Sequence, residues 1–122
     1  MLAAALETRG TSCVVTREPG GTEISDQVRK IIMAMKNTSM HPRTELLLFL
    51  SARAQLVEEV IRPRLAAGEI VISDRYADST LAYQGYGHGV DRDVIRSLLA
   101  FATGGLKPDL TLLLDVDAET GL

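Results

Sequence analysis

Asp74 and Arg75 come one residue after a short apolar run, and their side chains have the chemistry to hold a phosphate group. The run is Ile70 to Ile72, and Ser73 separates it from the pair. In an open parallel sheet, ligands bind just beyond the carboxyl ends of the strands. A guanidinium group offers a planar fork of donors that matches phosphate oxygens, and a carboxylate can approach the metal ion that such a ligand carries. A structural ion pair is the alternative, but the position favours a site for a phosphorylated small molecule.

Four polar side chains come shortly after this pair, and they could read the polar edges of a sugar or a base: Ser79, Thr80, Tyr83 and Gln84. The alternative is the start of a helix with ordinary capping hydroxyl groups.

A glycine-rich stretch, Thr16 to Thr22, lies between an expected strand and an expected helix. Its glycines would let the backbone approach a ligand, and the helix N-terminus that follows favours anions. A plain tight turn through Glu18 and Pro19 is the simpler explanation when composition alone is considered.

Arg29 lies in the helix that follows, where a single charge is usually solvated. It gains functional interest only if it points back toward the ligand edge of the sheet.

Phe49 and Arg53 are four residues apart on an expected helix, so they share one face, and Glu45 extends the row. Taken alone, the pair is explained by a core aromatic ring beside a surface cation. The functional alternative is base recognition, in which the ring stacks on a planar heterocycle and Arg53 donates to a carbonyl group. Such a donor accepts thymine or uracil, whereas the amino group of cytosine would leave two donors facing each other at a cost of about 1–3 kcal/mol.

The elements that must position these residues alternate between strand and helix. Apolar periodicity, capping residues and breakers predict them along the chain: the end of a helix over 1–9, a strand over 12–16, a helix from Thr22 to about Lys36, a loop over 37–42, a helix from Arg43 to Val60 that Pro63 kinks or ends, a strand over 70–72, a flexible loop over Gly85 to Gly89, a helix from Asp91 to Gly104, an apolar strand over 110–114, and the start of a helix at Asp117. This order predicts an α/β fold with a parallel sheet flanked by helices.

Composition excludes several kinds of partner. The 122 residues carry a formal net charge of −3, whereas nucleic-acid and anionic-membrane partners need a basic surface. The single cysteine, Cys13, allows no internal disulfide and favours a reducing compartment. No signal peptide or membrane span is evident, so we expect a cytoplasmic protein. His41 and His88 have no companion ligands at metal spacing and are interpreted as loop histidines, so we expect no metal site formed by the chain alone.

Taken together, four blocks resemble thymidylate kinase of the bacterial type, in the family's order and spacing. They are Thr16 to Thr22, Leu48 to Leu56, Asp74 to Gly85, and Pro108 to Val116. The resemblance covers almost the whole chain and implies a P-loop NTPase-like fold. It also implies transfer of phosphate from ATP to dTMP with Mg²⁺, within dTTP biosynthesis.

The resemblance implies roles for the residues singled out above. Arg29 and Arg75 would hold the dTMP phosphate, with Arg75 also near the incoming phosphoryl group, and Asp74 would organise the sugar and metal region. Glu18 and Pro19 would line the acceptor pocket.

On the base side, the resemblance implies that Phe49 stacks on thymine and that Arg53 bonds its O4 atom. Tyr83 would pack under the deoxyribose and exclude a ribose 2′-hydroxyl. Three further side chains would read the base edge or nearby backbone: Ser79, Thr80 and Gln84. The family also implies a homodimer for the complete enzyme.

The sequence departs from the family in one respect. It contains no G-x-x-x-x-G-K-[ST] motif, the loop that holds the ATP phosphates. We expect that loop before Met1 and the family's lid after Leu122, so that residues 1–122 form one partial nucleoside monophosphate kinase domain. The missing first strand would lie between the strands at Ile70 and Leu110, so each would have an unpaired edge. The chain alone is therefore expected to fold poorly and to be inactive. A non-catalytic nucleotide-binding remnant and a deoxynucleoside kinase-like protein are the alternatives.

Overall fold

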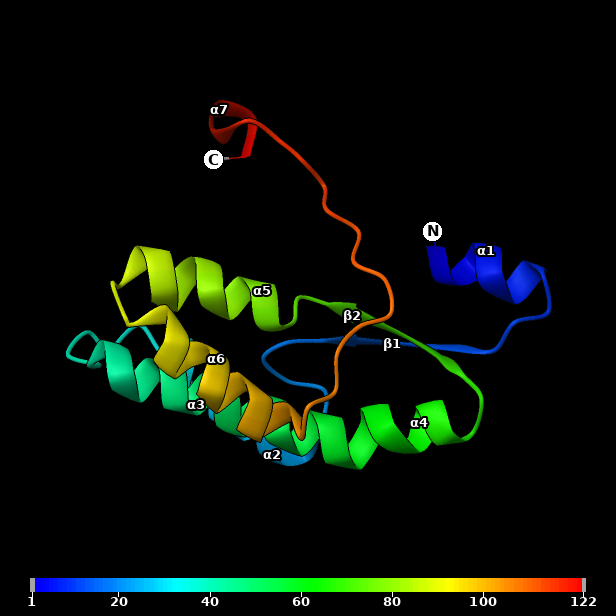
Figure 1. The fold of residues 1–122 in the computed structure, drawn as a ribbon, viewed down its shortest axis with the longest axis horizontal. Helices are drawn as coiled ribbons and strands as arrows, with labels where there is room; N and C mark the ends of the chain where they lie inside the picture. The colour runs from blue at the N-terminus through cyan, green and yellow to red at the C-terminus, as the bar shows by residue number, and fades with distance from the viewer. Residues whose placement is uncertain (1, 122) are drawn as a thin grey trace.

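The computed structural model describes residues 2–121 (Figure 1). Its elements follow in this order: α1 (Leu2–Thr8), β1 (Cys13–Arg17), α2 (Glu23–Ile32), α3 (Pro42–Leu56), the π-helical segment η1 (Val57–Ile61), α4 (Arg62–Ala66), β2 (Ile70–Asp74), α5 (Ala77–Thr80), the π-helical segment η2 (Leu81–Gly87), α6 (Arg92–Thr103) and α7 (Ala118–Gly121). This alternation confirms the α/β class expected from the sequence.

The two strands lie parallel and in register, with Cys13 opposite Ile70 and Arg17 opposite Asp74. Backbone pairing continues one step further, because the amide of Glu18 donates to the carbonyl of Asp74 at 3.0 Å. Both carboxyl ends therefore meet at one edge. The segment that follows β1 and the Asp74–Arg75 pair that ends β2 consequently start from the same place.

Helices α2, α3, α4 and α6 lie below the two strands in Figure 1, and α3 packs against both α2 and α6. One buried cluster joins α3 to α6 through apolar side chains: Leu46, Leu50, Ile95, Leu99 and Ala102. A second joins the end of α3 and η1 to β2 and contains Leu56, Val57 and Ile61. The buried Ser25 hydroxyl donates to the carbonyl of Ala52 at 2.8 Å and ties α2 to α3. The helix with Phe49 and Arg53 is thus held from both sides.

The helix expected from Thr22 to Lys36 begins as predicted but ends earlier, at Ile32. The Thr22 hydroxyl accepts the amide hydrogen of Ser25 at 3.0 Å and caps its start. At the other end, the side-chain amide of Asn37 donates to the carbonyl of Ile31 at 2.8 Å. Asn37 thus satisfies a terminal carbonyl that another helical turn would have used, and the prediction was too long by one turn.

Pro63 does not end the long helix. The sequence predicted either an end or a kink there, and the helix bounds rule out the end only. Helical backbone runs from Pro42 to Ala66, and Pro63 sits in the first turn of α4. Proline has no amide hydrogen, and its ring clashes with the carbonyl four residues earlier in a regular α-helix. Here the wider π-helical turns of η1 come directly before it, so the helix continues past the ring.

The stretch from Gly85 to Gly89 was expected to be a flexible loop, but its first part is helical. Helix α5 continues as η2 to Gly87. Gly85 is buried, and a Cβ atom placed there would lie 3.4 Å from Cδ1 of Ile95 on α6. That distance is an ordinary van der Waals contact, so the packing at this position does not require glycine, and Gly85 was wrongly interpreted as a loop signal.

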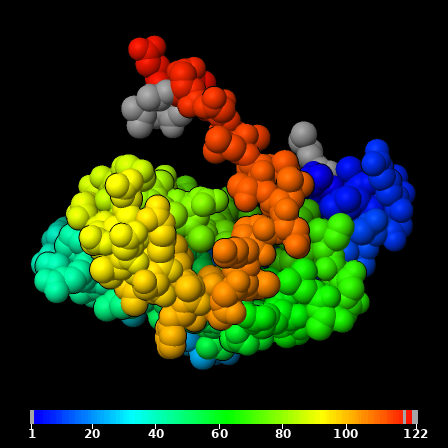
Figure 2. Space-filling view, in the orientation of Figure 1, coloured from blue at the N-terminus to red at the C-terminus, as the bar shows by residue number. Residues whose placement is uncertain are grey.

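The apolar run from Leu110 to Leu114 forms no strand, which contradicts the prediction. Leu110, Leu113 and Leu114 are 74%, 84% and 88% exposed. A strand needs a hydrogen-bonded neighbour, and the described residues form a sheet of β1 and β2 only, which offers none here. Figure 2 shows the chain standing clear of the helices as it leads into α7. Asp117 does cap that helix, accepting the amide of Thr120 at 2.8 Å.

No helix in the described part of the chain has the length and apolar character needed to cross a bilayer.

Candidate functional site: a polar cleft at the strand ends

A cleft of about 540 Å³ opens at the carboxyl ends of the strands, and we call it the polar cleft. Its lining comes from four regions: Arg17, Glu18, Pro19, Arg29 and Met33 around β1 and α2; Glu45, Phe49 and Arg53 on α3; Asp74 and Arg75 at the end of β2; and Ser79, Thr80, Tyr83, Gln84 and His88 from α5 onward. All eleven side chains predicted as site residues line it. Phe49 and Arg53 face the same space as Arg75, which is the arrangement that a nucleotide site requires.

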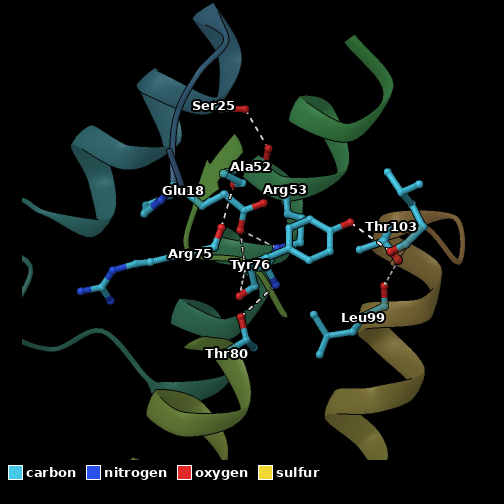
Figure 3. Close-up of polar contacts among 12 residues, drawn as sticks. Glu18, Ser25, Ala52, Arg53, Arg75, Tyr76, Thr80, Leu99 and Thr103 are labelled. Atoms are coloured by element: carbon cyan, nitrogen blue, oxygen red, sulfur yellow. Dashed lines mark hydrogen bonds and ion pairs between the residues drawn. The ribbon is translucent and has the colours of Figure 1, made fainter. Parts of the chain in front are cut away.

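Arg53 forms the foot of the polar cleft and is only 2% exposed. Its Nε hydrogen is donated to Glu18 at 2.6 Å, and its terminal nitrogens donate to the Thr80 hydroxyl at 2.9 Å and the Tyr76 carbonyl at 3.0 Å (Figure 3). A further contact of Nη2 with the same Glu18 oxygen, Oε2, completes the ion pair. The Tyr76 ring stacks on the guanidinium, and the Cζ atom of Arg53 lies 5.3 Å from the ring centre. The cation is therefore fixed in place by two segments besides its own helix, the one after β1 and the one from Tyr76 to Thr80.

The hydrogen bonds of Arg53 leave part of its donor capacity unused. A guanidinium group carries five N–H donors, one on Nε and two on each terminal nitrogen. The hydrogen bonds of Arg53 use the Nε hydrogen, one hydrogen on Nη1 and one on Nη2, and Nη2 also makes an ion-pair contact with Glu18. The second Nη1 hydrogen has no partner among the described residues. The structure thus combines a rigid guanidinium with an Nη1 donor that a ligand can use.

Glu18 is almost as deeply buried as Arg53. Burial raises the pKa of its carboxyl group above the ordinary value, and the hydrogen bond and charge of Arg53 act in the opposite direction. Its second oxygen, Oε1, has no hydrogen-bond partner among the described residues. The carboxylate therefore depends on Arg53 for its ionisation, and the two side chains act as a unit.

The rim near the strand ends holds three arginines. Arg29 donates to the carbonyl of Pro19 at 2.9 Å, so it does point back toward the ligand edge. Arg75 has a backbone φ of 72°, which is unusual for a residue other than glycine, and its guanidinium lies 5.3 Å from the centre of the Tyr83 ring. Figure 3 shows its side chain directed away from the Arg53 cluster. Arg17, which the strand register places beside Asp74, is the third.

A structural ion pair was the alternative explanation of Asp74 and Arg75, and the structure does not contain it. Within residues 2–121, neither side chain makes an ion pair within 4.0 Å. Backbone at positive φ in a residue other than glycine costs about 1–3 kcal/mol and gathers at functional sites. Both observations favour the functional interpretation of the pair.

Sequence reasoning did not assign five residues of this region to the site. Arg17, Met33, Glu45 and His88 line the polar cleft, and Tyr76 lies beneath Arg53. Arg17 and Tyr76 each neighbour an assigned residue, and Glu45 continues the row of Phe49 and Arg53. These neighbouring positions could have identified the three residues from the sequence. Met33 and His88 line the cleft only because of the fold, and no sequence pattern marks them as site residues.

Mg²⁺ in phosphate-transfer sites is usually held by one or two carboxylates together with substrate phosphates. Residues 2–121 contain no group of three or more ligating side chains arranged around one point. Asp74, at the end of β2, is a cleft carboxylate without an ion pair in that range. The residues present therefore fit a metal ion held mainly by a bound phosphate, with Asp74 as its protein contact.

Comparison with known proteins shows the family of the chain. A family model described as thymidylate kinase matches residues 1–122. The chain belongs to the thymidylate kinase family. It is 56% identical over 122 residues to the thymidylate kinase of Roseiflexus castenholzii, covering all of this chain and 53% of that relative. For the enzyme of Roseiflexus sp. the identity is 54% over 122 residues, covering all of this chain and 54% of the relative.

The crystal structure of thymidylate kinase from Ehrlichia chaffeensis matches with a TM-score of 0.73 and 38% identity, covering 83% of this chain and 55% of that one. This match confirms the P-loop NTPase type of α/β fold. The chain spans about half the length of the curated relatives it matches.

Proposed function

We propose that this chain supplies the dTMP-binding part of a thymidylate kinase, which transfers the γ-phosphoryl group of ATP to dTMP. A dTMP phosphate oxygen would form a bond to the γ-phosphorus, the bond to the β–γ bridging oxygen would break, and dTDP and ADP would result. The observation that carries the proposal is the polar cleft, which gathers an aromatic ring, a fixed guanidinium and further arginines in one space.

The base would lie between the walls formed by α3 and η2. Phe49 would stack on the thymine ring, and the free Nη1 hydrogen of Arg53 would be donated to O4. Two polar neighbours, Thr80 and Gln84, are nearly buried, at 2% and 3% exposure. They would read the remaining base edge together with Ser79, while Tyr83 would pack under the sugar and exclude a 2′-hydroxyl.

The phosphate would lie at the strand ends. Arg29 and Arg75 would donate to its oxygens, and Arg75 would also neutralise charge on the incoming phosphoryl group. Glu18 and Pro19 would shape the pocket between base and phosphate. Phosphoryl transfer needs mainly positioning and charge stabilisation from the protein, which matches the excess of arginines at this end.

Asp74 would contact Mg²⁺, which supplies charge neutralisation between the donor and acceptor phosphates. The ATP phosphates need a glycine-rich loop with a lysine, and residues 1–122 contain no such motif. We therefore assign to this chain the acceptor site and propose that ATP is bound outside it.

A second copy of the chain is the partner that we propose for the outer face of α2, as part of a homodimer. Ile24 and Ile31 on this helix are 54% and 47% exposed, and Leu47 on α3 is 56% exposed. Apolar side chains gathered on neighbouring helices favour a protein contact. We propose a cytoplasmic address for the enzyme, with neither nucleic acid nor a membrane as a partner.

Calorimetric titration of the purified chain with dTMP, thymidine and dCMP tests the proposal. We expect dTMP to bind most tightly. Thymidine lacks the phosphate, and the amino group of dCMP would place a second hydrogen-bond donor opposite the Arg53 donor. A parallel assay of ADP formation from ATP and dTMP should show no turnover by the chain alone.

Two results would favour the alternatives. Tighter binding of thymidine than of dTMP would indicate a deoxynucleoside kinase-like protein. Binding of dTMP that is unaffected by replacing Arg75 would indicate a nucleotide-binding remnant without a working phosphate site. The absence of any nucleotide binding by folded chain would refute the proposal.

A further inference from the structure

Two polar contacts join α3 to the helix formed by α5 and η2, one at each end of the polar cleft. At the foot, Arg53 donates to the Thr80 hydroxyl at 2.9 Å. At the rim, Nε2 of His88 lies 3.0 Å from Oε2 of Glu45. The two contacts are eight positions apart on both sides, so the two helices run antiparallel, as they do in Figure 1.

Phe49 lies halfway between the two contacts on α3, and Gln84 lies halfway on the opposite wall. Eight residues of α-helix span about 12 Å. The contacts therefore frame the stretch of cleft where, according to the proposed function, the base and sugar lie. The foot is buried, whereas the side chains of Glu45 and His88 are 26% and 43% exposed. The rim contact can consequently open without unfolding the core.

We propose that Glu45 and His88 form a rim clasp that sets the width of the polar cleft and positions Phe49 against Tyr83 for nucleotide binding. The clasp acts through these neighbours, so both members are positioning residues. The amide of His88 donates to the carbonyl of Tyr83 at 3.1 Å, which links the imidazole directly to that wall. This inference rests on the proposed function, because it assumes that the cleft takes dTMP.

The clasp is a contact between an imidazole and a carboxylate, so the charged groups that surround it affect its strength. The titratable and charged groups that share the cleft with His88 are Arg17, Glu18, Arg29, Glu45, Arg53, Asp74, Arg75 and Tyr83. Among the described residues, Glu45 is the carboxylate within 4.0 Å of the imidazole.

Three variants test this: His88→Lys keeps a side chain that can pair with the Glu45 carboxylate, His88→Gln replaces the imidazole by an uncharged amide, and Glu45→Gln removes the carboxylate. Affinities for dTMP are compared between the variants at one pH. We expect His88→Gln and Glu45→Gln each to bind dTMP about threefold more weakly than the wild type. His88→Lys should bind dTMP at least as tightly as the wild type, and adding Glu45→Gln to it should lower that affinity about threefold.

Asp93→Asn is the matched control, because it breaks the Arg96–Asp93 pair, which has a 2.8 Å contact on α6 outside the cleft. Hydrogen exchange of residues 81–88 without nucleotide gives an independent measure, which Glu45→Gln should accelerate and Asp93→Asn should not. Equal affinities and equal exchange across the variants would overturn the clasp. If the wild type fails to bind dTMP while exchange still responds to Glu45→Gln, the clasp stands and the proposed function fails.

Discussion

The guanidinium of Arg53 and the carboxylate of Glu18 form an ion pair in which both side chains are at most 3% exposed. The pair joins the segment after β1 to the last turn of α3, 35 positions further along the chain. Two charges withdrawn from water depend on each other, because neither has another opposite charge within 4.0 Å in the described residues. The pair therefore links the stability of the fold to the shape of the polar cleft.

Replacing Glu18 by Gln tests this link. The variant keeps the size of the side chain but leaves the Arg53 charge buried without a counter-charge, which costs about 3–5 kcal/mol in comparable cases. We expect the free energy of unfolding, measured by urea denaturation, to fall by about 3 kcal/mol and dTMP binding to weaken with it. Glu58→Gln is the control, because its 2.9 Å pair with Arg62 is exposed and should contribute less than about 1 kcal/mol. Equal losses in the two variants would contradict the special role of the buried pair.

Phe49→Ala tests base stacking, and the chain provides its own control. It contains two phenylalanines, and the other, Phe101, is 88% exposed on α6. Stacking of a base on an aromatic ring contributes about 1–3 kcal/mol, so we expect the Kd for dTMP to rise by about 5- to 150-fold in Phe49→Ala. Phe101→Ala should leave the Kd unchanged. Calorimetry at equal protein concentrations checks both, and a similar effect at the two positions would rule out stacking by Phe49.

Local patterns placed the candidate residues at strand ends and on one helix face, and the structure brings them together around one cleft, while their roles stay predictions from the family resemblance. The spacing of Phe49 and Arg53 placed both on the wall of the cleft, and the position of Asp74 and Arg75 placed them at its edge. The Glu45–His88 contact could not be predicted from the sequence, because it joins residues 43 positions apart that share no local pattern.

The fold was less predictable where tertiary structure outweighs local preference. The apolar residues from Leu110 to Leu114 have strand propensity, but a strand also needs a neighbour to pair with. Pro63 usually stops a helix, yet the π-helical turns of η1 before it accommodate the ring. In both places the structure depends on residues other than those that suggested the prediction. For Leu110 to Leu114 it depends on a neighbouring strand, and for Pro63 it depends on η1.

Arg75→Ala tests the phosphate end by comparing two ligands. If Arg75 holds the dTMP phosphate, its removal should weaken dTMP binding by about 1.5–3 kcal/mol, the usual size of a hydrogen bond to a charged group. Binding of thymidine, which has the same base and sugar without the phosphate, should change little. Arg96→Ala, on the outer face of α6 and outside the cleft, should affect neither ligand. Parallel losses for dTMP and thymidine would show that Arg75 acts on the base or on the fold instead.

Asp91, the N-cap of α6, should give the chain a specific stability loss in acid. Its Oδ1 accepts the amide hydrogens of Asp93 and Val94 at 2.8 and 3.1 Å. These hydrogen bonds, led by that of Val94, hold the pKa of the Asp91 carboxyl below its ordinary value of 3.8. A carboxyl group with a lowered folded pKa stabilises the fold above its unfolded pKa, and that contribution is lost as the pH falls through the folded value.

Asparagine caps helices about as well as aspartate but carries no titrating group. We therefore expect Asp91→Asn to match the wild type at pH 7 and to lose less stability below about pH 4, the ordinary range of an aspartate carboxyl. Asp91→Ala should be destabilised at every pH, because no cap remains. Urea denaturation midpoints between pH 2.5 and 7 check the three proteins, whose other carboxylates are identical. Parallel curves for the wild type and Asp91→Asn would show that the charge of the cap contributes nothing to the stability of α6.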